Sequence, residues 1–189
     1  IADESANPAF IAADFLSQAE HGVDSQAMLV TASESVVEPV MQAIREQLDR
    51  LPRKEITEKS LSHSRLIVLK DKQEVIDFTN LYAPEHLIIQ TADYADIAGQ
   101  IENAGSVFMG PYTPESAGDY ASGTNHTLPT NGYAKAYSGV NLDSFIKKIT
   151  FQEITADGIK RLGETIRTMA ANEQLDAHKN AVTIRLKTL

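Results

Sequence analysis

Residues 27–48 have the sequence AMLVTASESVVEPVMQAIREQL, and this stretch decides the fold class. Its first part, 27–31, is a short and continuous apolar run, which is typical of a strand buried on both faces of a parallel sheet. Ser33 can then cap a helix whose apolar side chains recur at helical spacing until the Leu51-Pro52 step, where proline ends it. A buried strand followed at once by an amphipathic helix is the repeating unit of α/β proteins.

The same unit recurs along the first two thirds of the chain. Further apolar runs predict three more strands and two connecting helices, the strands at 66–69, 87–89 and 106–109 and the helices at 74–82 and 92–104. An earlier helix begins at Asn7-Pro8, since asparagine caps helices and proline suits their first turn, and Gly22 ends it. These elements predict an α/β fold with a parallel sheet flanked by helices.

Beyond the predicted strands the pattern changes twice. Residues 110–138 are rich in Gly, Pro, Ser, Thr and Asn, and they predict a long loop of the kind that serves as a lid or binding loop. A helix follows from 158 to about 175, and a last apolar segment follows it. We therefore expect an α/β body at 1–140 that carries most of the site, and a helical C-terminal appendage at 141–189.

Composition excludes several classes of function. The formal net charge of −9 disfavours nucleic acid and anionic membranes as partners. The chain has no cysteine, which excludes disulfides, thiolate nucleophiles and cysteine-bound metal clusters. No run approaches the roughly 18 apolar residues of a membrane span, and the N-terminus lacks a secretory pattern, so the expected compartment is the cytoplasm. The chain begins with Ile1, not methionine, which suggests a fragment of a longer protein.

Two pairs of side chains are candidates for chemistry. Gln18 and His21 lie three residues apart at the end of the first helix and could share a ligand or metal, although His21 alone could simply complement the helix dipole. Glu85 and His86 stand at the start of a predicted strand, where an acid and an imidazole could exchange protons. Neighbours on an extended backbone point to opposite sides, so this pair could also be two unrelated surface residues.

The polar loop and the appendage offer further candidates. Residues 113–130 bring together a carboxylate, an imidazole and glycines, which suits ligand binding as well as an ordinary surface loop. Glu173 and His178 lie on the appendage, where a solvated helix face is the simpler interpretation. No dinucleotide or phosphate-binding fingerprint is present.

The run SAGDYASGTNHTLPT at 116–130 resembles the signature of the histidinol dehydrogenase family. Four other blocks carry the same resemblance, namely LSQAEHG at 16–22, YAPEHL at 82–87, the stretch 132–145 and AHKNAV at 177–182. The resemblance extends over the whole chain, but members of the family are more than twice as long. It therefore implies the C-terminal portion of such a chain, with part of a Rossmann-like domain.

The resemblance implies a zinc site and a substrate site. It makes Gln18, His21, Asp119 and His178 the zinc ligands, a set of imidazoles, a carboxylate and an amide that suits this ion. The same four residues, with His86, His126 and Glu173, would contact the substrate. Family members are homodimers whose C-terminal segment crosses to the partner, so Glu173 and His178 would complete the partner's site.

The implied reaction is the oxidation of L-histidinol to L-histidine in two NAD-dependent steps through an aldehyde. His86 would take the alcohol proton, and Glu85 would activate the water that adds to the aldehyde. The residues that bind NAD are expected in the portion that this chain lacks. The chain could therefore be part of an active enzyme, or a non-catalytic dimer that binds zinc or histidinol.

Overall fold

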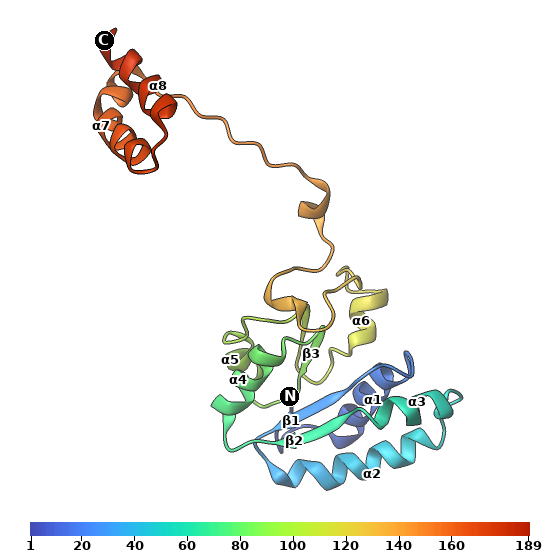
Figure 1. Cartoon of the computed structure of the whole chain (residues 1–189). Coiled ribbons are helices and arrows are strands. Elements are labelled where there is room, and N and C mark those ends of the chain that lie inside the picture. The colour runs from blue at the N-terminus through green and yellow to red at the C-terminus, as the bar shows by residue number, and fades with distance from the viewer. The chain divides into compact units, whose positions relative to one another are not determined.

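The structure is a computed structural model that describes residues 1–189, and the chain divides into two compact units (Figure 1). The first unit comprises Ile1–Phe145 and the second Ile146–Leu189. No helix in either unit has the length and apolar character needed to cross a membrane.

All four predicted strands are present in the first unit, and they form two parallel pairs. Strand β1 (Met28–Thr31) pairs with β2 (Arg65–Val68), with Met28 opposite Arg65. Strand β3 (His86–Ile89) pairs with β4 (Ser106–Met109), with His86 opposite Ser106. The predicted α/β fold with parallel strands flanked by helices is therefore confirmed, and its strands form two sheets of two strands each.

Residues 1–3 lie between the two strand pairs. The Ala2 amide donates to the Val30 carbonyl at 3.3 Å, and the Gln90 amide donates to the Ile1 carbonyl at 2.9 Å. Ala2 also forms a parallel bridge with Gln90. The resulting spatial order is β2, β1, residues 1–3, β3, β4. When residues 1–3 are counted as the first strand along the chain, this order is 3-2-1-4-5, which is the order of Rossmann-like folds.

The helices of the first unit cover these strands. They are α1 (Pro8–Ala19), α2 (Val37–Leu48), α3 (Lys54–Leu61), α4 (Lys72–Tyr82), α5 (Tyr94–Ala98) and α6 (Glu115–Tyr120), with short 3₁₀ turns η1 (Glu34–Val36), η2 (Tyr133–Lys135) and η3 (Leu142–Phe145). Asn7 caps α1 as predicted, because its side chain accepts from the Ala9 amide. One core cluster joins α1 and α2 to β1 around Phe15, Leu29 and Val40, and a second joins α4 to β3 around Ile76 and Ile89.

Three expectations about helices were wrong, one about the extent of a helix and two about whether a helix forms. The helix expected at 92–104 is confined to Tyr94–Ala98, because the Asn80 side chain accepts from the Glu102 and Asn103 amides and holds that segment out of helical geometry. Helix α3 forms where none was predicted. Helix α6 forms inside the expected loop at 110–138, where Pro and Gly punctuation concealed it.

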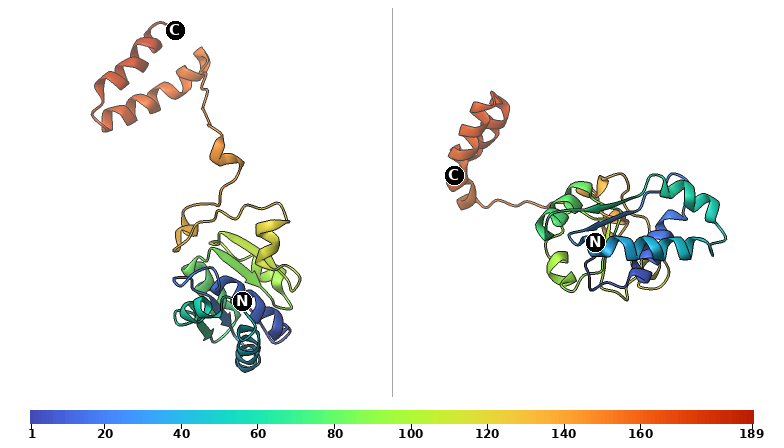
Figure 2. Two further views of the ribbon diagram at one scale, coloured as in Figure 1. Left: turned by 90° about the vertical axis from the view of Figure 1, so that its right-hand side faces the viewer. Right: turned by 90° about the horizontal axis from the view of Figure 1, so that it is seen from below.

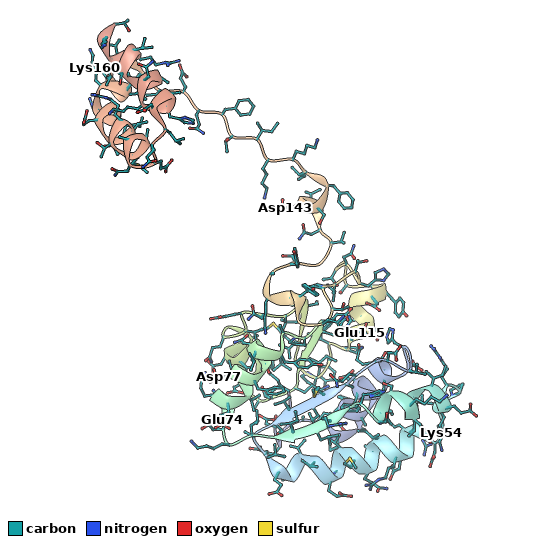
Figure 3. The ribbon with its side chains drawn as sticks, viewed as in Figure 1. Lys54, Glu74, Asp77, Glu115, Asp143 and Lys160 are labelled. Atoms are coloured by element: carbon teal, nitrogen blue, oxygen red, sulfur yellow. The ribbon has the colours of Figure 1, made fainter.

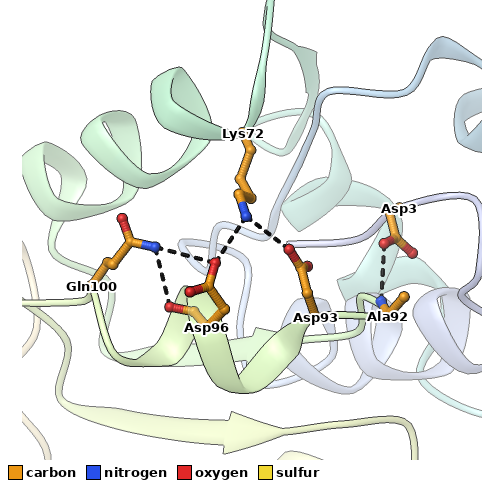
Figure 4. Close-up of polar contacts among 6 residues, drawn as sticks. All are labelled: Asp3, Lys72, Ala92, Asp93, Asp96 and Gln100. Carbon is orange, nitrogen blue, oxygen red and sulfur yellow. Dashed lines mark hydrogen bonds and ion pairs between the residues drawn. The ribbon is translucent and has the colours of Figure 1, made fainter.

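An exposed charge cluster joins α4 to α5 (Figure 4). The Lys72 ammonium lies 2.9 Å from an Asp93 carboxylate oxygen and 2.8 Å from one of Asp96. Nearby, Asp3 accepts from the Ala92 amide at 2.9 Å. Solvent screens exposed ion pairs, so this cluster links α4 to α5 and adds little to the stability of the fold.

The second unit is a pair of helices, α7 (Ala156–Asn172) and α8 (Asp176–Lys187). Thr155 caps α7 by accepting from the Gly158 amide at 3.1 Å. The helices pack closely at Gly163, where an added Cβ would lie 2.7 Å from a Leu186 methyl carbon. Only Ala170 and Val182 are buried among the apolar residues of the two helices, and Leu162, Met169 and Ile184 remain exposed.

Candidate functional site

Three segments of the first unit meet at the amino end of β3. The last turn of α1 carries Gln18, with His21 just beyond it, and Glu85 and His86 enter β3. Helix α6 contributes Glu115, and Figure 3 labels this residue where α6 faces the rest of the first unit. The His86 Nε2 atom lies 3.8 Å from Glu115 Oε1. Open parallel sheets usually bind ligands at the carboxyl ends of their strands, so this site lies at the opposite end.

Backbone pairing fixes the entry into β3. Ala83 adopts a left-handed conformation at φ 54° and ends α4. The Gly105 amide then donates to Pro84 and the Ser106 amide to Glu85, both at 2.9 Å. These two bonds hold Glu85 and His86 in extended geometry beside the start of β4.

Close packing sets α6 against β4. An added Cβ at Gly118 would lie 2.6 Å from a ring carbon of Phe108, so only glycine permits this approach. Figure 2 shows α6 beside the green strands β3 and β4. Glu115 and Asp119 lie four residues apart on α6, which places both on one face of the helix. That face meets His86, and His86, Glu115 and Asp119 can each offer a ligand atom within 4.8 Å of the others.

Burial dominates the electrostatics of this cluster. The Glu115 side chain is 3% exposed and that of His86 is 14% exposed. Burial, with Asp119 as the next cause, raises the pKa of Glu115 to about 7, and Gln18 opposes this rise. Burial lowers the pKa of His86, while Glu85 and Asp119 act in the opposite direction. The neutral imidazole is therefore the favoured form of His86 at pH 7.

Two buried polar atoms of the site lack hydrogen-bond partners. They are Gln18 Nε2 and Glu115 Oε1. Buried polar groups are nearly always satisfied, so these two mark the place where a ligand or a small rearrangement completes the site. Imidazole, carboxylate and amide groups form a donor set that suits zinc, and the residues present therefore fit such an ion.

The structure brings five of the predicted residues together, namely Gln18, His21, Glu85, His86 and Asp119. His126 lies on the exposed loop after α6, and none of the contacts described above reaches it. Glu173 and His178 belong to the second unit, where both are exposed.

Sequence reasoning assigned no role to Glu115 or Asp14. Glu115 shares a face with Asp119, a signal that the loop interpretation of 110–138 concealed. Asp14 lies one helical turn before Gln18, and the Gln90 side chain donates to it. Burial raises the pKa of Asp14 to about 6, although Gln90 and the chain's N-terminal ammonium group act to lower it. With Gln18 and His86, both Asp14 and Gln90 line a cleft of about 1210 Å³.

Replacing Asp14 with Asn is expected to flatten the pH dependence of folding stability. The folded-state pKa of Asp14 is raised, so the folded protein holds a proton that the unfolded chain releases, and stability falls as pH rises from 3.8 to about 6. Asp14→Asn removes that loss, on the order of 1 kcal/mol because the half-buried carboxylate is screened by solvent. Urea unfolding between pH 3.8 and about 6 measures the free energy of unfolding of the parent and of Asp14→Asn. Parallel pH profiles for these two proteins would contradict the prediction, and Asp24→Asn on the surface is the control.

Replacing Gly105 with Ala is expected to destabilise the first unit by about 1–3 kcal/mol. The added Cβ would lie 2.5 Å from the backbone oxygen of Glu85, which cannot move without disturbing the start of β3. Gly99→Ala is the matched control, because its Cβ would meet nothing closer than 3.5 Å. Chemical denaturation of the two variants measures the difference, and equal stabilities would show that the backbone at Glu85 yields freely.

The fold and the site together define a class of protein. It is an α/β protein of Rossmann-like strand order whose buried imidazole, carboxylates and amide suit metal-assisted proton chemistry. Comparison with known sequences narrows this class. A sequence model described as histidinol dehydrogenase matches residues 1–186, and the chain therefore belongs to the histidinol dehydrogenase family.

Individual relatives and a solved structure agree with this assignment. The chain is 67% identical to a histidinol dehydrogenase of Bacteroides fragilis and 58% identical to a chloroplastic histidinol dehydrogenase of Arabidopsis thaliana, and it aligns over its whole length with both. A crystal structure of histidinol dehydrogenase from Elizabethkingia anophelis matches 99% of the chain with a TM-score of 0.92 at 56% identity. The chain spans 44%, 41% and 43% of these three proteins, respectively.

Proposed function

We propose that the chain carries the substrate and metal side of an enzyme that oxidises L-histidinol to L-histidine with zinc and NAD, in histidine biosynthesis. The observation that supports this most directly is the meeting of Gln18, His86, Glu115 and Asp119 at one buried place, in a chain of this family. The reaction passes through the aldehyde, and each of its two oxidations removes two electrons and two protons from the substrate.

Gln18, His21 and Asp119 would hold zinc, with His178 of the exchanged appendage as the fourth ligand. When bound, zinc supplies a positive centre that holds the substrate by its amine and imidazole nitrogens. Gln18 lies on α1 and Asp119 on α6, so both helices must bring a side chain to the same ion. His126 and Glu173 would bind other parts of the substrate, and Glu173 suits a positively charged amine or imidazole.

His86 would act as the base of the first oxidation. Its lowered pKa keeps the imidazole neutral, so its Nε2 lone pair can accept the proton of the alcohol oxygen. Glu85 would accept a proton from the water that adds to the aldehyde carbon, and the hydrated aldehyde is then the substrate of the second oxidation. Residues 1–189 supply no thiol that could form a thiohemiacetal, which agrees with a hydrate at this stage.

NAD supplies the hydride acceptor for both oxidations when it is bound. The residues that bind it are expected in the part of the family's chain outside residues 1–189. The substrate side and the cofactor side would therefore be contributed by different parts of the full-length protein.

The proposal includes a homodimer in the cytoplasm. In it, residues 141–189 cross to the partner, and Glu173 and His178 complete the partner's site. The two-helix unit leaves Leu162, Met169 and Ile184 exposed, and a helix pair of this kind gains stability when a partner covers its apolar side chains.

A second candidate function is the binding of zinc or histidinol by a non-catalytic dimer. The absence of a dinucleotide fingerprint favours it for the chain taken alone. Spectroscopic measurement of NADH formed from histidinol, with and without the N-terminal part of a relative added in trans, separates the two. Activity restored by the added part supports the enzyme, and zinc-dependent histidinol binding without any restored activity supports the binding protein.

A further inference from the structure

Glu115 is the most deeply buried carboxyl group of the site, and the reaction proposed above gives it no task. It lies at the first turn of α6 with 3% of its side chain exposed. A carboxyl group is costly to bury unless it is hydrogen-bonded. Its Oε1 atom nevertheless has no hydrogen-bond partner. The environment of Glu115 therefore leaves one strong acceptor unused.

The Gln18 side chain leaves the complementary donor unused. Its Nε2 atom is buried without a partner, and the amide is close enough to Glu115 to lower that residue's pKa. One hydrogen bond from Gln18 Nε2 to Glu115 Oε1 satisfies both atoms. The bond is independent of the charge on Glu115, because a neutral carboxyl group also offers a carbonyl oxygen as acceptor.

His86 is another candidate partner of the Glu115 Oε1 atom, and the distance between them disfavours it. The separation of 3.8 Å between His86 Nε2 and Glu115 Oε1 exceeds a hydrogen bond. A bond to Glu115 would also occupy the ring nitrogen that the proposed reaction needs for the substrate proton. Gln18 has no competing task for its Nε2 atom, since only its oxygen can serve as a ligand.

We propose that Glu115 is a positioning residue that fixes the orientation of the Gln18 amide. Gln18 Nε2 donates to Glu115 Oε1, and the Gln18 oxygen is thereby directed into the site as a ligand atom. Without this bond the amide can turn its nitrogen toward the site, and a metal ion must then reorient the amide before the oxygen can bind. Partners that orient ligands in this way typically change metal affinity by about 10- to 100-fold. This inference rests on the proposed zinc site, in which Gln18 is a ligand.

The test compares Glu115→Gln, which keeps an acceptor oxygen, with Glu115→Met, which has a similar length and no strong acceptor. Chelator competition measures zinc affinity in the 189-residue chain and in the variants. Glu115→Gln is expected to change the zinc dissociation constant by less than about 3-fold, and Glu115→Met to raise it by about 10- to 100-fold. In a Gln18→Ala background, Glu115→Met is expected to add little, because the amide that it orients is gone.

A second measurement needs no metal. The side-chain amide signals of Gln18 in a ¹⁵N NMR spectrum are expected to show slow hydrogen exchange in the parent and in Glu115→Gln, and fast exchange in Glu115→Met. Equal exchange rates in all three proteins overturn the proposed bond. So does a result in which Glu115→Met changes the signals of the His86 ring nitrogens and leaves the Gln18 amide signals as they are in the parent.

The two measurements separate this inference from the proposed function. If the parent binds no zinc, the metal site of the proposed function fails, and the NMR comparison alone still decides the Gln18–Glu115 bond. If zinc binds and Glu115→Gln weakens it as much as Glu115→Met does, the negative charge matters and the positioning role is wrong. Additive losses in the Gln18→Ala background also overturn it, because Glu115 then acts without Gln18.

Discussion

Replacing His86 with Asn is expected to lower kcat for histidinol oxidation by about 10²- to 10⁴-fold in the protein supplied with its cofactor-binding part. In the proposed reaction the neutral imidazole accepts the alcohol proton, and asparagine has no basic nitrogen to replace it. Steady-state NADH formation measures the loss. Zinc content is expected to stay unchanged, because His86 is not one of the proposed ligands.

Glu85→Gln is the matched control for this experiment. It leaves the first oxidation largely intact and slows the second, so that NADH forms from histidinol while the aldehyde accumulates. An unchanged rate in His86→Asn would show that another group takes the proton. Equal losses with alcohol and aldehyde substrates in both variants would show that the two residues act together and not in separate steps.

Replacing His178 with Ala is expected to abolish tight zinc binding and to weaken affinity by more than about 100-fold. The proposed site has only four protein ligands, and His178 is the one that comes from the second unit. Losing it leaves an amide, one imidazole and one carboxylate, a set that holds zinc weakly. Zinc retained after dialysis, measured by atomic absorption, reports the result.

His63→Ala is the control for His178→Ala, because it removes an exposed histidine that has no proposed role. Zinc retained at full stoichiometry in His178→Ala would remove this residue from the ligand set. It would also remove the main reason for expecting an exchanged segment. Zinc lost from both variants would point to a general effect of histidine removal, such as weaker binding at the surface.

The strands were predictable from sequence because each is a short apolar run bounded by turn residues. Their spatial order was not, since it depends on residues 1–3, whose hydrogen bonds to Val30 and Gln90 join the two pairs. Helix α6 was hidden because its proline and glycine neighbours are typical of loops. Its place beside β4 requires the close approach of Gly118 to Phe108, which no local sequence pattern reports.

The candidate site was predictable in part, and mainly through the family resemblance. Spacing alone paired Gln18 with His21 and Glu85 with His86, but it offered no reason to bring the two pairs together. Glu115 was missed because it differs from other carboxylates only in its burial, which raises its pKa. Burial is a property of the folded unit and cannot be read from the sequence pattern. The roles of Glu173 and His178 depend on a partner chain and stay predictions.

The segment that joins the two units makes the chain vulnerable to proteases. Residues 146–154 are exposed throughout and lie outside any helix or strand, and they include Lys147 and Lys148. Trypsin cleavage there separates His178 and Glu173 from the rest of the chain. If the proposed ligand set holds, a preparation nicked in this way is expected to lose zinc and substrate affinity together. Intact mass is therefore the first property to verify in any sample that lacks metal.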